Sequence, residues 1–356
     1  MKKFFFGLAI FLKWLIISAV LLEVSCFLII SFSNYWIYGQ VRDGNRVRYD
    51  PYILFQTVGY PRPTHNNPGP LEHDKCKIFW MFGGSTMSGC TEDDTKTIPS
   101  FLADVLNRQE PVLPAYLINC GEPSFNSLME TKYLQKMLIE SQVSPAVIIF
   151  YDGANDCTYF AQDRAPDGGH INYSRVKGLV ECYHRSFFGL LKPLNAAFYS
   201  SYAVELYDKI RQGVIPIKED SPELRQFVDT VEKRYYYVHK MAGLIGARFL
   251  LFWQPSWWVE TGKVSPDVSK DEDIIVSRRF ALRHNFKVVN QALVARLKDK
   301  PYFIDFQNVL CPRTEPAYQT DGIHLQDIGR QMVAQAMGKY LKEHLSTTAA
   351  LGGGPR

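Results

Sequence analysis

Four short segments of this 356-residue chain carry residue types that together would suit acyl chemistry. Ser85 follows two glycines in the segment Phe82-Gly-Gly-Ser-Thr86, and two glycines let the backbone turn sharply and expose a hydroxyl. Asp321 and His324 stand three residues apart near the C-terminus, so a carboxylate can orient an imidazole there. A serine hydroxyl becomes nucleophilic when an oriented imidazole removes its proton. The three residues therefore form a candidate nucleophile, base and orienting acid.

Two further segments hold groups that would stabilise a negatively charged oxygen. Gly121 ends the segment Asn119-Cys-Gly121, and a glycine lets a backbone N–H come close to a ligand. Asn155 lies in Tyr151-Asp-Gly-Ala-Asn-Asp156, and its amide is a donor suited to a developing oxyanion. Taken singly, each of the four segments is also what an ordinary turn or helix cap contains. Their order along one chain favours a common site.

The hydrophobic pattern indicates the elements that would hold these residues. Short apolar runs, typical of strands buried on both faces of a parallel sheet, occupy residues 77–82, 115–119, 146–151, 248–252 and 302–306. Helical patterns cover residues 97–108, 127–141, 222–246, 275–298 and 325–345. The third helix begins with a serine cap and a proline at Ser221-Pro222. This alternation predicts an α/β fold, a three-layer α/β/α sandwich with a five-stranded parallel sheet, whose strand ends carry the candidate residues.

In this order, the four segments resemble the SGNH (GDSL-like) hydrolase superfamily, over roughly residues 75–345. Its marks are a serine after the first strand, a glycine after the second, Gly-x-Asn-Asp after the third and Asp-x-x-His near the C-terminus. The resemblance implies an SGNH, flavodoxin-like fold in which Ser85 is the nucleophile, His324 the base and Asp321 its orienting group. It also implies an oxyanion hole formed by Ser85, Gly121 and Asn155. This chain has Gly-Gly-Ser-Thr where many members have Gly-Asp-Ser, which leaves the serine in place.

The N-terminus carries the longest apolar stretch of the chain. Residues 4–32 are interrupted only by Lys13 and Glu23. At about 1.5 Å per residue, a helix of this length crosses a hydrocarbon core about 30 Å thick. A cleaved signal peptide is the competing interpretation, but its apolar region would be only about 7–15 residues long. We expect one uncleaved transmembrane helix, with Glu23 either paired with another helix or tolerated within a tilted single span.

Composition divides the chain into further segments. Residues 1–38 are the predicted membrane anchor, and residues 39–76, rich in Tyr, Pro, Gly and Asn, are predicted to form an extended stalk or linker. Residues 77–346 are the predicted hydrolase-like domain. An aromatic-rich insertion at 157–221 suggests a lid or subdomain. Residues 347–356 are predicted to be a disordered tail.

Overall composition excludes several classes of protein. The chain is 46% hydrophobic and 21% charged, as expected of a folded globular protein rather than a disordered or collagen-like one. Forty Lys and Arg against 36 Asp and Glu leave a net charge of +4, too even for a nucleic-acid binder. There is no Cys-x-x-Cys spacing, so neither a metal site nor a cofactor is predicted. Cys157 and Cys182 are the first pair to test for a disulfide, and buried free thiols are the equal alternative.

These residues lead to one functional hypothesis and one alternative. We expect a membrane-anchored serine esterase or O-acyltransferase that acts, through an acyl-serine, on acyl esters (acetyl above all) of an extracytoplasmic glycan or lipid. Counting positive residues does not decide the orientation, but a short N-terminal tail before a long domain favours a single-pass protein with a periplasmic or extracellular domain. Some anchored members of the superfamily work beside multi-spanning acyltransferases in polysaccharide O-acylation, so the resemblance makes such a protein a candidate partner, with which Glu23 in the anchor is compatible. The alternative is a non-catalytic glycan-binding or scaffold protein, which would more readily have lost Ser85, Asp321 or His324.

Overall fold

The chain forms two units. The computed structural model describes residues 2–38, 47–69, 75–89, 91, 93–108, 114–171, 173–185, 189, 191–211, 215–276 and 280–345. Unit 1 contains the residues up to Gly44 together with Asn172–Ile215, and unit 2 contains Asn45–Ile171 and the residues from Pro216 on. The predicted tail, 347–356, lies outside the described residues. Unit 2 alone builds the α/β sandwich, whereas the described part of unit 1 is helical.

Unit 2 is organised around the five-stranded parallel sheet that the sequence predicts. Its strands are β3 (Lys77–Gly83), β4 (Ala115–Gly121), β5 (Val147–Asp152), β6 (Arg248–Trp253) and β7 (Phe303–Asp305). They lie in the order β4-β3-β5-β6-β7, and every neighbouring pair is parallel. The strand order changes direction at β3. In sheets of this kind, ligands bind at the carboxyl ends of the strands beside such a switch point.

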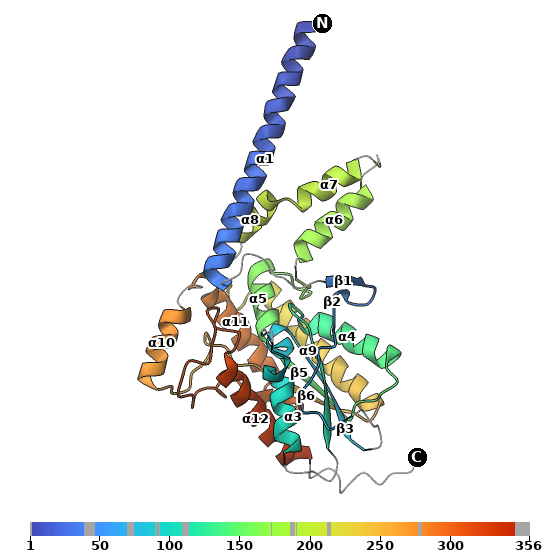
Figure 1. Cartoon of the computed structure of the whole chain (residues 1–356), viewed down its shortest axis with the longest axis vertical. Coiled ribbons are helices and arrows are strands. Elements are labelled where there is room, and N and C mark those ends of the chain that lie inside the picture. Colours follow the sequence, from blue (N-terminus) through green and yellow to red (C-terminus); the bar gives the residue numbers. More distant parts are fainter. Residues whose placement is uncertain are drawn as a thin grey trace. The chain divides into compact units, whose positions relative to one another are not determined.

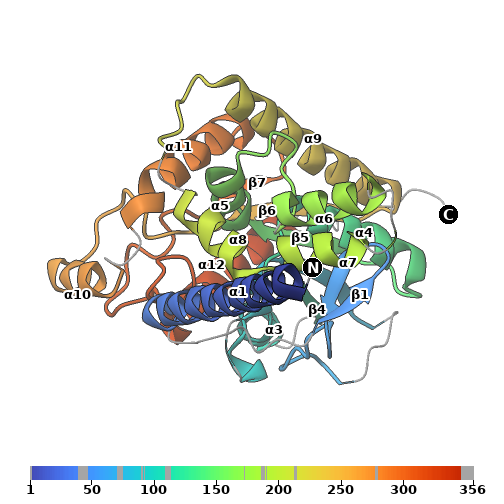
Figure 2. The ribbon, with the colours of Figure 1, turned by 90° about the horizontal axis from the view of Figure 1, so that it is seen from above.

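Helices cover both faces of this sheet and complete the three-layer sandwich (Figure 2). Helices α3 (Ile98–Asn107) and α12 (Asp327–Leu345) pack together on one face. On the other face lie α4 (Ser127–Glu140), α9 (Pro222–Leu244) and α11 (Phe280–Leu297). The shorter elements are α2 (Ser85–Ser88), η1 (Asp94–Lys96), α5 (Ala154–Asp163) and α10 (Pro266–Val276). The predicted fold class is confirmed. Of the predicted helix over 275–298, residues 275–276 belong to α10 and Phe280–Leu297 form α11, while residues 277–279 lie outside the described part of the chain.

Local sequence fixes where several helices begin. Ser221 accepts a hydrogen bond from the N–H of Leu224 at 3.2 Å, and Pro222 is the first residue of α9, as predicted. Thr97 caps α3 in the same way, through the N–H of Ser100. Since the first N–H groups of a helix have no acceptor inside it, such side chains determine the starting residue.

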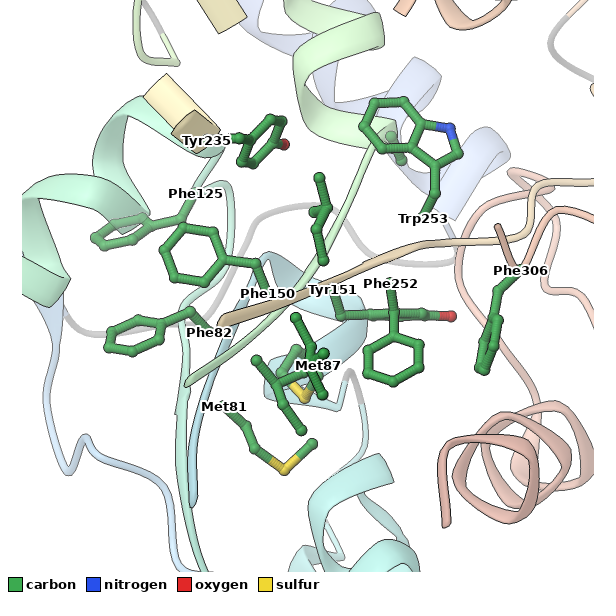
Figure 3. Packing of buried hydrophobic residues seen from close by; sticks show 14 of the residues in the cluster. Met81, Phe82, Met87, Phe125, Phe150, Tyr151, Tyr235, Phe252, Trp253 and Phe306 are labelled. Atoms are coloured by element: carbon green, nitrogen blue, oxygen red, sulfur yellow. The ribbon is translucent and has the colours of Figure 1, made fainter. Parts of the chain in front are cut away.

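The core of unit 2 lies on both sides of the sheet. All six residues of β5 are buried. Phe150, in the middle of this strand, packs between Phe82 of β3 and Phe249 of β6, with ring centroids 5.2 and 5.3 Å away. Phe82 and Phe150 point to one face of the sheet and Met81 points to the other (Figure 3). Burial on both faces explains why these strands are continuous apolar runs without alternation.

Residues 47–69 do not form the extended stalk that was predicted over residues 39–76. Strands β1 (Val47–Asp50) and β2 (Leu54–Thr57) form an antiparallel hairpin, and Ile53 between them is fully buried. The side-chain amide of Asn67 bonds both the carbonyl and the N–H of Leu117, each at 2.9 Å. This stretch covers the edge strand β4 through side-chain pairing, which leaves no hydrophobic periodicity in its sequence. Residues 39–46 and 70–74 lie outside the described part of the chain.

Only part of the predicted insertion 157–221 lies outside unit 2. Residues 157–171 belong to unit 2, whereas Asn172–Ile215 belong to unit 1. The helices of that segment are α6 (Tyr173–Arg185), α7 (Leu191–Tyr199) and α8 (Tyr202–Arg211).

The cysteines do not form the pair singled out from the sequence. Cys157 is a free, fully buried thiol in α5. The thiol of Cys182, in α6, lies 3.4 Å from the hydroxyl of Tyr199 at the end of α7. The disulfide between Cys157 and Cys182 is therefore not formed in this structure.

Unit 1 joins these three helices to α1 (Lys2–Tyr38). Among the described residues, one helix, Lys3–Trp36, is long and apolar enough to cross a membrane, with 34 residues and a mean hydropathy of 2.5. A signal sequence has the same signature. Helix α8 lies beside α1 (Figure 1), where Glu23 accepts hydrogen bonds from the N–H groups of Tyr202 and Ala203 at 2.7 and 3.4 Å. Glu23 is thus paired with another helix, and that helix belongs to the same chain.

Candidate active site

The turn after β3 places Ser85 at the carboxyl end of this strand, where the strand order of the sheet changes direction. Gly83 ends β3, and Ser85 begins the short helix α2. A side chain on Gly84 would collide with Nδ2 of Asn155, and one on Gly83 would lie 2.6 Å from the Cβ of Met87. The two glycines are therefore required because the turn packs closely against its neighbours.

The structure brings Ser85, His324 and Asp321 into one hydrogen-bonded line, although the first two are 239 residues apart in sequence. Ser85 Oγ and His324 Nε2 are 2.6 Å apart, and His324 Nδ1 contacts Asp321 Oδ2. With Nδ1–H donating to the carboxylate, Nε2 is the acceptor that faces the serine hydroxyl. The histidine side chain is 23% exposed and that of Asp321 only 6%. The imidazole is thus partly accessible, while its orienting group is enclosed.

Asp321 is held as a buried carboxylate. Burial by itself raises the pKa of this group, but the charge of His324 and several hydrogen bonds outweigh burial, so the pKa lies below its ordinary value. The N–H groups of Ile323 and His324 both donate to Oδ1 at 2.9 Å, and the histidine ring contacts Oδ2. Asp321 therefore stays ionised at neutral and mildly acidic pH.

A buried ion-pair network holds the beginning of the C-terminal loop. Arg313 donates from Nε to both carboxylate oxygens of Glu272, at 3.0 and 3.1 Å, and from Nη1 to Glu260 at 3.1 Å. Glu272 also accepts the N–H of Ala317 at 2.9 Å, and Glu260 accepts the hydroxyl of Tyr318 at 2.5 Å. The side chains of the arginine and both glutamates are 6% exposed or less. The network ties α10 and its approach to the loop that continues to Asp321 and His324.

This network was not predicted, because nothing in the local sequence indicates it. Glu272 lies in the run Lys270-Asp-Glu-Asp273, whose charges are typical of a solvated helix surface. Its neighbour Asp271 is exposed, whereas Glu272 is fully buried. The difference arises only because Arg313 and Ala317 lie opposite this face of α10.

Asn155 lies where the sequence predicts a donor. Its Nδ2 donates to the carbonyl of Phe125 at 2.5 Å and lies directly against Gly84, the residue before Ser85. The side chain therefore connects the end of β5 with the turn after β3 and with the turn after β4. Thr86 provides a second connection, since its hydroxyl donates to Gln254 Oε1 at 3.1 Å, just beyond β6.

The N–H of Gly121, predicted as an oxyanion donor, has a partner within its own segment. Its N–H donates to Asn119 Oδ1 at 3.0 Å, and a side chain on it would collide with the backbone of Ser88 in α2. Glycine is therefore required for α2 to pack against β4, and its N–H is already engaged. A glycine at a strand end indicates that another group comes close, and here that group is the backbone of α2. The oxyanion role of Gly121 stays a prediction.

Asp156, the last residue of the Gly-x-Asn-Asp motif, faces the interior instead of the site. It accepts hydrogen bonds from the N–H and the hydroxyl of Ser127, at 3.0 and 2.8 Å, at the beginning of α4. Asp152 and Glu130 complete a buried acidic group, and burial raises the pKa of all three, to about 7 for Asp152. Asp156 therefore fixes the start of α4.

Comparison with known proteins gives low similarity throughout. No protein-family model and no curated protein matches the chain. An acetyl xylan esterase, AlAXEase, is 14% identical, with 74% of this chain and 99% of that chain covered and a TM-score of 0.42. The psychrotrophic esterase EstA from Pseudoalteromonas sp. is 12% identical (76% and 99% covered, TM-score 0.40), and the lipase/acylhydrolase from Enterococcus faecalis is 16% identical (75% and 96% covered, TM-score 0.37). Because the identities and TM-scores are this low, we infer the function from the geometry of the site.

Proposed function

We propose that this chain is a membrane-anchored serine esterase of the SGNH type that acts on acyl esters of an extracytoplasmic glycan or lipid. The observation that carries the proposal is the hydrogen-bonded line from Asp321 through His324 to Ser85, at the carboxyl end of β3. A scaffold protein would have no need of an enclosed carboxylate, an oriented imidazole and a serine hydroxyl 2.6 Å from it.

In the proposed reaction, Ser85 Oγ forms a bond to the carbonyl carbon of the ester while His324 Nε2 takes the hydroxyl proton. Asp321 stabilises the imidazolium that results. When the tetrahedral intermediate collapses, the imidazolium gives this proton to the departing alcohol, and an acyl-serine remains. Water, activated by the same imidazole, then releases the acid. A sugar hydroxyl in place of water would give acyl transfer through the same intermediate.

The negative charge on the carbonyl oxygen needs donors beside Ser85. We propose two donors: the N–H of Ser85 and the second N–H of Asn155 Nδ2, whose other N–H goes to Phe125. Each donor of this kind is worth about 3 kcal/mol of transition-state stabilisation. Because the N–H of Gly121 is engaged, we place a further backbone donor in the turn between β4 and α4. In that turn Ser124 has a φ of 67°, and the carbonyl of Phe125 accepts the bond from Asn155.

We infer that α1 is a permanent anchor. Glu23 accepts two N–H groups of α8, and Cys26 and Ile30, one and two turns further on, are 6% and 4% exposed. A signal sequence removed after export would have no reason to be packed against the mature chain. With α1 as the single span, we propose that the hydrolase-like domain lies on the periplasmic or extracellular side.

The proposal does not require a multi-spanning acyltransferase. Glu23 is the anchor residue compatible with such a partner, and its hydrogen-bonding partners lie in α8 of this chain. Association with a multi-spanning protein is therefore a separate hypothesis.

The proposal is tested with a fluorophosphonate probe, which phosphonylates activated serines. The full chain in detergent is incubated with the probe and digested, and the adduct is located by mass spectrometry. We expect the adduct on Ser85 in the wild type and none in His324→Ala. Absence of an adduct from a folded wild-type protein, or an adduct on another serine, would overturn the proposed site.

A further inference from the structure

We propose that helices α6, α7 and α8 form a second membrane contact, a platform that lies in the lipid interface beside the C-terminal part of α1. The inference rests on the proposed span by α1 and extends it. It concerns unit 1 alone, and the occupant of the exposed apolar surface is the lipid bilayer.

Helix α1 is longer than a membrane requires. Its apolar part, Lys3–Trp36, has 34 residues, whereas about 20 suffice for a hydrocarbon core of about 30 Å. Residues 3–22 are exposed except for the partly exposed Ile17, as expected of a helix surrounded by lipid. Glu23, directly after this stretch, is hydrogen-bonded to α8. If residues 3–22 cross the core, the remainder of α1 lies at the membrane surface, and the ionisable Glu23 is at the boundary rather than at mid-membrane.

One face of this remaining part of α1 is fitted to α8. The carboxylate of Glu23 accepts the first N–H groups of α8, an arrangement favoured by the positive end of the helix dipole. The ring of Phe27 lies 5.0 Å from that of Tyr202, and Asn34 Oδ1 accepts from Lys209 Nζ at 3.2 Å. These contacts run along α8 from its first turn to its last. Helix α8 therefore lies beside the end of the span, at the depth of the interface.

Arg175 joins the other two helices to α8. From α6 it donates to the carbonyl of Tyr199, at the end of α7, at 2.8 Å, and to the carbonyl of Ser201 at 3.2 Å. Its Nη1 also lies 3.4 Å from Glu205 in α8. A buried or membrane-facing helix end needs such donors for its last carbonyls. The three helices are thus held together, and their depth follows from that of α8.

The outer surface of these helices is apolar. Leu194 and Phe198, four residues apart in α7, are 65% and 63% exposed, and Tyr207 and Ile210, three apart in α8, are 62% and 65% exposed. Lys192 is the single charged residue among the nine of α7. Exposure of such a weakly charged helix to water is unfavourable, whereas aromatic and aliphatic side chains at this spacing are typical of helices in the membrane interface.

The charges of the segment favour lipid as the occupant. Between residues 173 and 211 the basic residues (Arg175, Lys177, Arg185, Lys192, Lys209 and Arg211) outnumber the acidic ones (Glu181, Glu205 and Asp208). Basic side chains beside an apolar face are typical of helices that bind anionic membranes. A protein partner would also cover an apolar face, but continuity with the membrane span and the excess of basic charge both favour the bilayer.

The test uses the full chain in vesicles of phosphatidylcholine and phosphatidylglycerol that contain a phospholipid with a photoactivated diazirine in its acyl chain. After irradiation, modified peptides are mapped by mass spectrometry. We expect adducts in residues 3–22, in α7 and in α8. Apolar side chains of unit 2 with comparable exposure are the internal control, and we expect none on Tyr236, Tyr237, Leu244 or Ile274.

The outcomes separate this inference from the proposed function. Adducts in α1 but none in α7 or α8 would overturn the platform and leave the anchor. Absence of adducts from α1 as well would overturn the span. Fluorophosphonate labelling of Ser85 in the same sample reports on the esterase site independently of either result.

A pair of variants tests the surface directly. Leu194→Glu combined with Phe198→Glu should lower the labelling of α7 and α8 several-fold without changing fluorophosphonate labelling, whereas Leu244→Glu should change neither. Wild-type lipid labelling in the double variant would overturn the proposal. So would a cross-link from α7 to another protein in native membranes together with no lipid adduct in the purified chain, since the occupant would then be a protein.

Discussion

Strand β5 and the first part of helix α1 are both strongly apolar, yet they have opposite environments. Every residue of Val147–Asp152 is buried inside unit 2. In residues 3–22 of α1, by contrast, side chains such as Phe4 and Phe11 are 72% and 62% exposed. Apolar sequence therefore specifies only that water must be excluded. In unit 2 the chain itself supplies the covering surface, and in unit 1 we propose that the bilayer does.

Two glutamates, one in each unit, show the same difference. Glu272 of unit 2 is enclosed with Arg313, so both charges are compensated within the domain. Glu23 of unit 1 is compensated by backbone N–H groups of α8 alone among the contacts described. Removing a group from unit 2 should accordingly affect catalysis and global stability, while removing one from unit 1 should affect only the membrane-proximal helices.

The largest effect is expected for the nucleophile. Ser85→Ala removes the hydroxyl that faces His324 and should lower turnover of a short-chain aryl ester by up to about 10⁶-fold. Thermal unfolding should be nearly unchanged, because a small polar side chain at the start of α2 contributes little packing. The matched control is Ser88→Ala, in the same helix, whose hydroxyl lies 2.6 Å from that of Tyr60 instead. Full activity in Ser85→Ala would exclude this serine.

The orienting carboxylate should come next. Asp321→Asn removes the charge that fixes the histidine tautomer, and we expect a loss of up to about 10⁴-fold in turnover. His324→Ala should be at least as severe, because it removes the base. Rates for both variants and the wild type on one activated ester decide this, and an active His324→Ala would rule out the triad.

The pH dependence of the wild-type rate checks the assignment of roles. Since the pKa of Asp321 is lowered, this group remains ionised well below neutral pH and cannot cause a loss of activity there. Activity should nevertheless fall on acidification, because a protonated imidazole cannot accept the serine proton. The stability contributed by ionised Asp321 is lost only at a pH below its ordinary pKa. A flat rate profile from about pH 5 to 9 would contradict His324 as the base.

The buried ion pairs of unit 2 should dominate its stability. Arg313→Leu leaves Glu272 and Glu260 enclosed without their counter-charge and should lower the free energy of unfolding by about 3–5 kcal/mol. Arg296→Leu is the control, because Arg296 pairs with Asp229 and Glu232 at an exposure of 45% and should change it by less than about 1 kcal/mol. If both variants lowered the free energy of unfolding equally in urea denaturation, burial would not determine how much these ion pairs contribute to stability.

A smaller effect with a defined pH window is expected at Glu122, beside the end of β3. Burial raises the pKa of this group from 4.5 to about 7. Between these values the folded state keeps a proton that the unfolded state has lost, so its contribution to stability falls as pH rises from 4.5 to about 7. Glu122→Gln should therefore stabilise the protein by up to about 3 kcal/mol at pH 8 and not at pH 4. A pH-independent gain would contradict the raised pKa.

The smallest effect is expected at Glu23 in unit 1. Glu23→Gln keeps an acceptor for the N–H groups of α8 but removes the charge at the helix start, which is worth up to about 1 kcal/mol. We expect faster limited proteolysis between α7 and α8 and unchanged esterase activity. Lys13→Met, in the exposed part of α1, is the control. Loss of activity in Glu23→Gln would show that unit 1 supports the catalytic site.

Much of the fold is predictable because it depends on neighbours in sequence. The strand positions, the cap at Ser221 and the long apolar helix follow from burial periodicity and from dihedral or hydrogen-bonding preferences within a few residues. Residues 47–69, which form the hairpin and cover the edge strand β4, were predicted to be part of a stalk. The prediction failed there because contacts such as that of Asn67 with the backbone of Leu117, fifty residues away, leave no pattern in the local sequence.

The sequence by itself determined the order of the strands and helices, the apolar span and the three residues Ser85, Asp321 and His324, because residue type limits what a backbone can adopt and what a side chain can do. Only the tertiary structure decided which groups meet. It placed the serine 2.6 Å from the imidazole, occupied the N–H of Gly121 with Asn119 and turned Asp156 toward α4. It also enclosed Glu272 and gave Glu23 a helix to cap. A hydrogen-bond partner is selected by proximity across the fold, and proximity between distant segments is set by the packing of the whole domain.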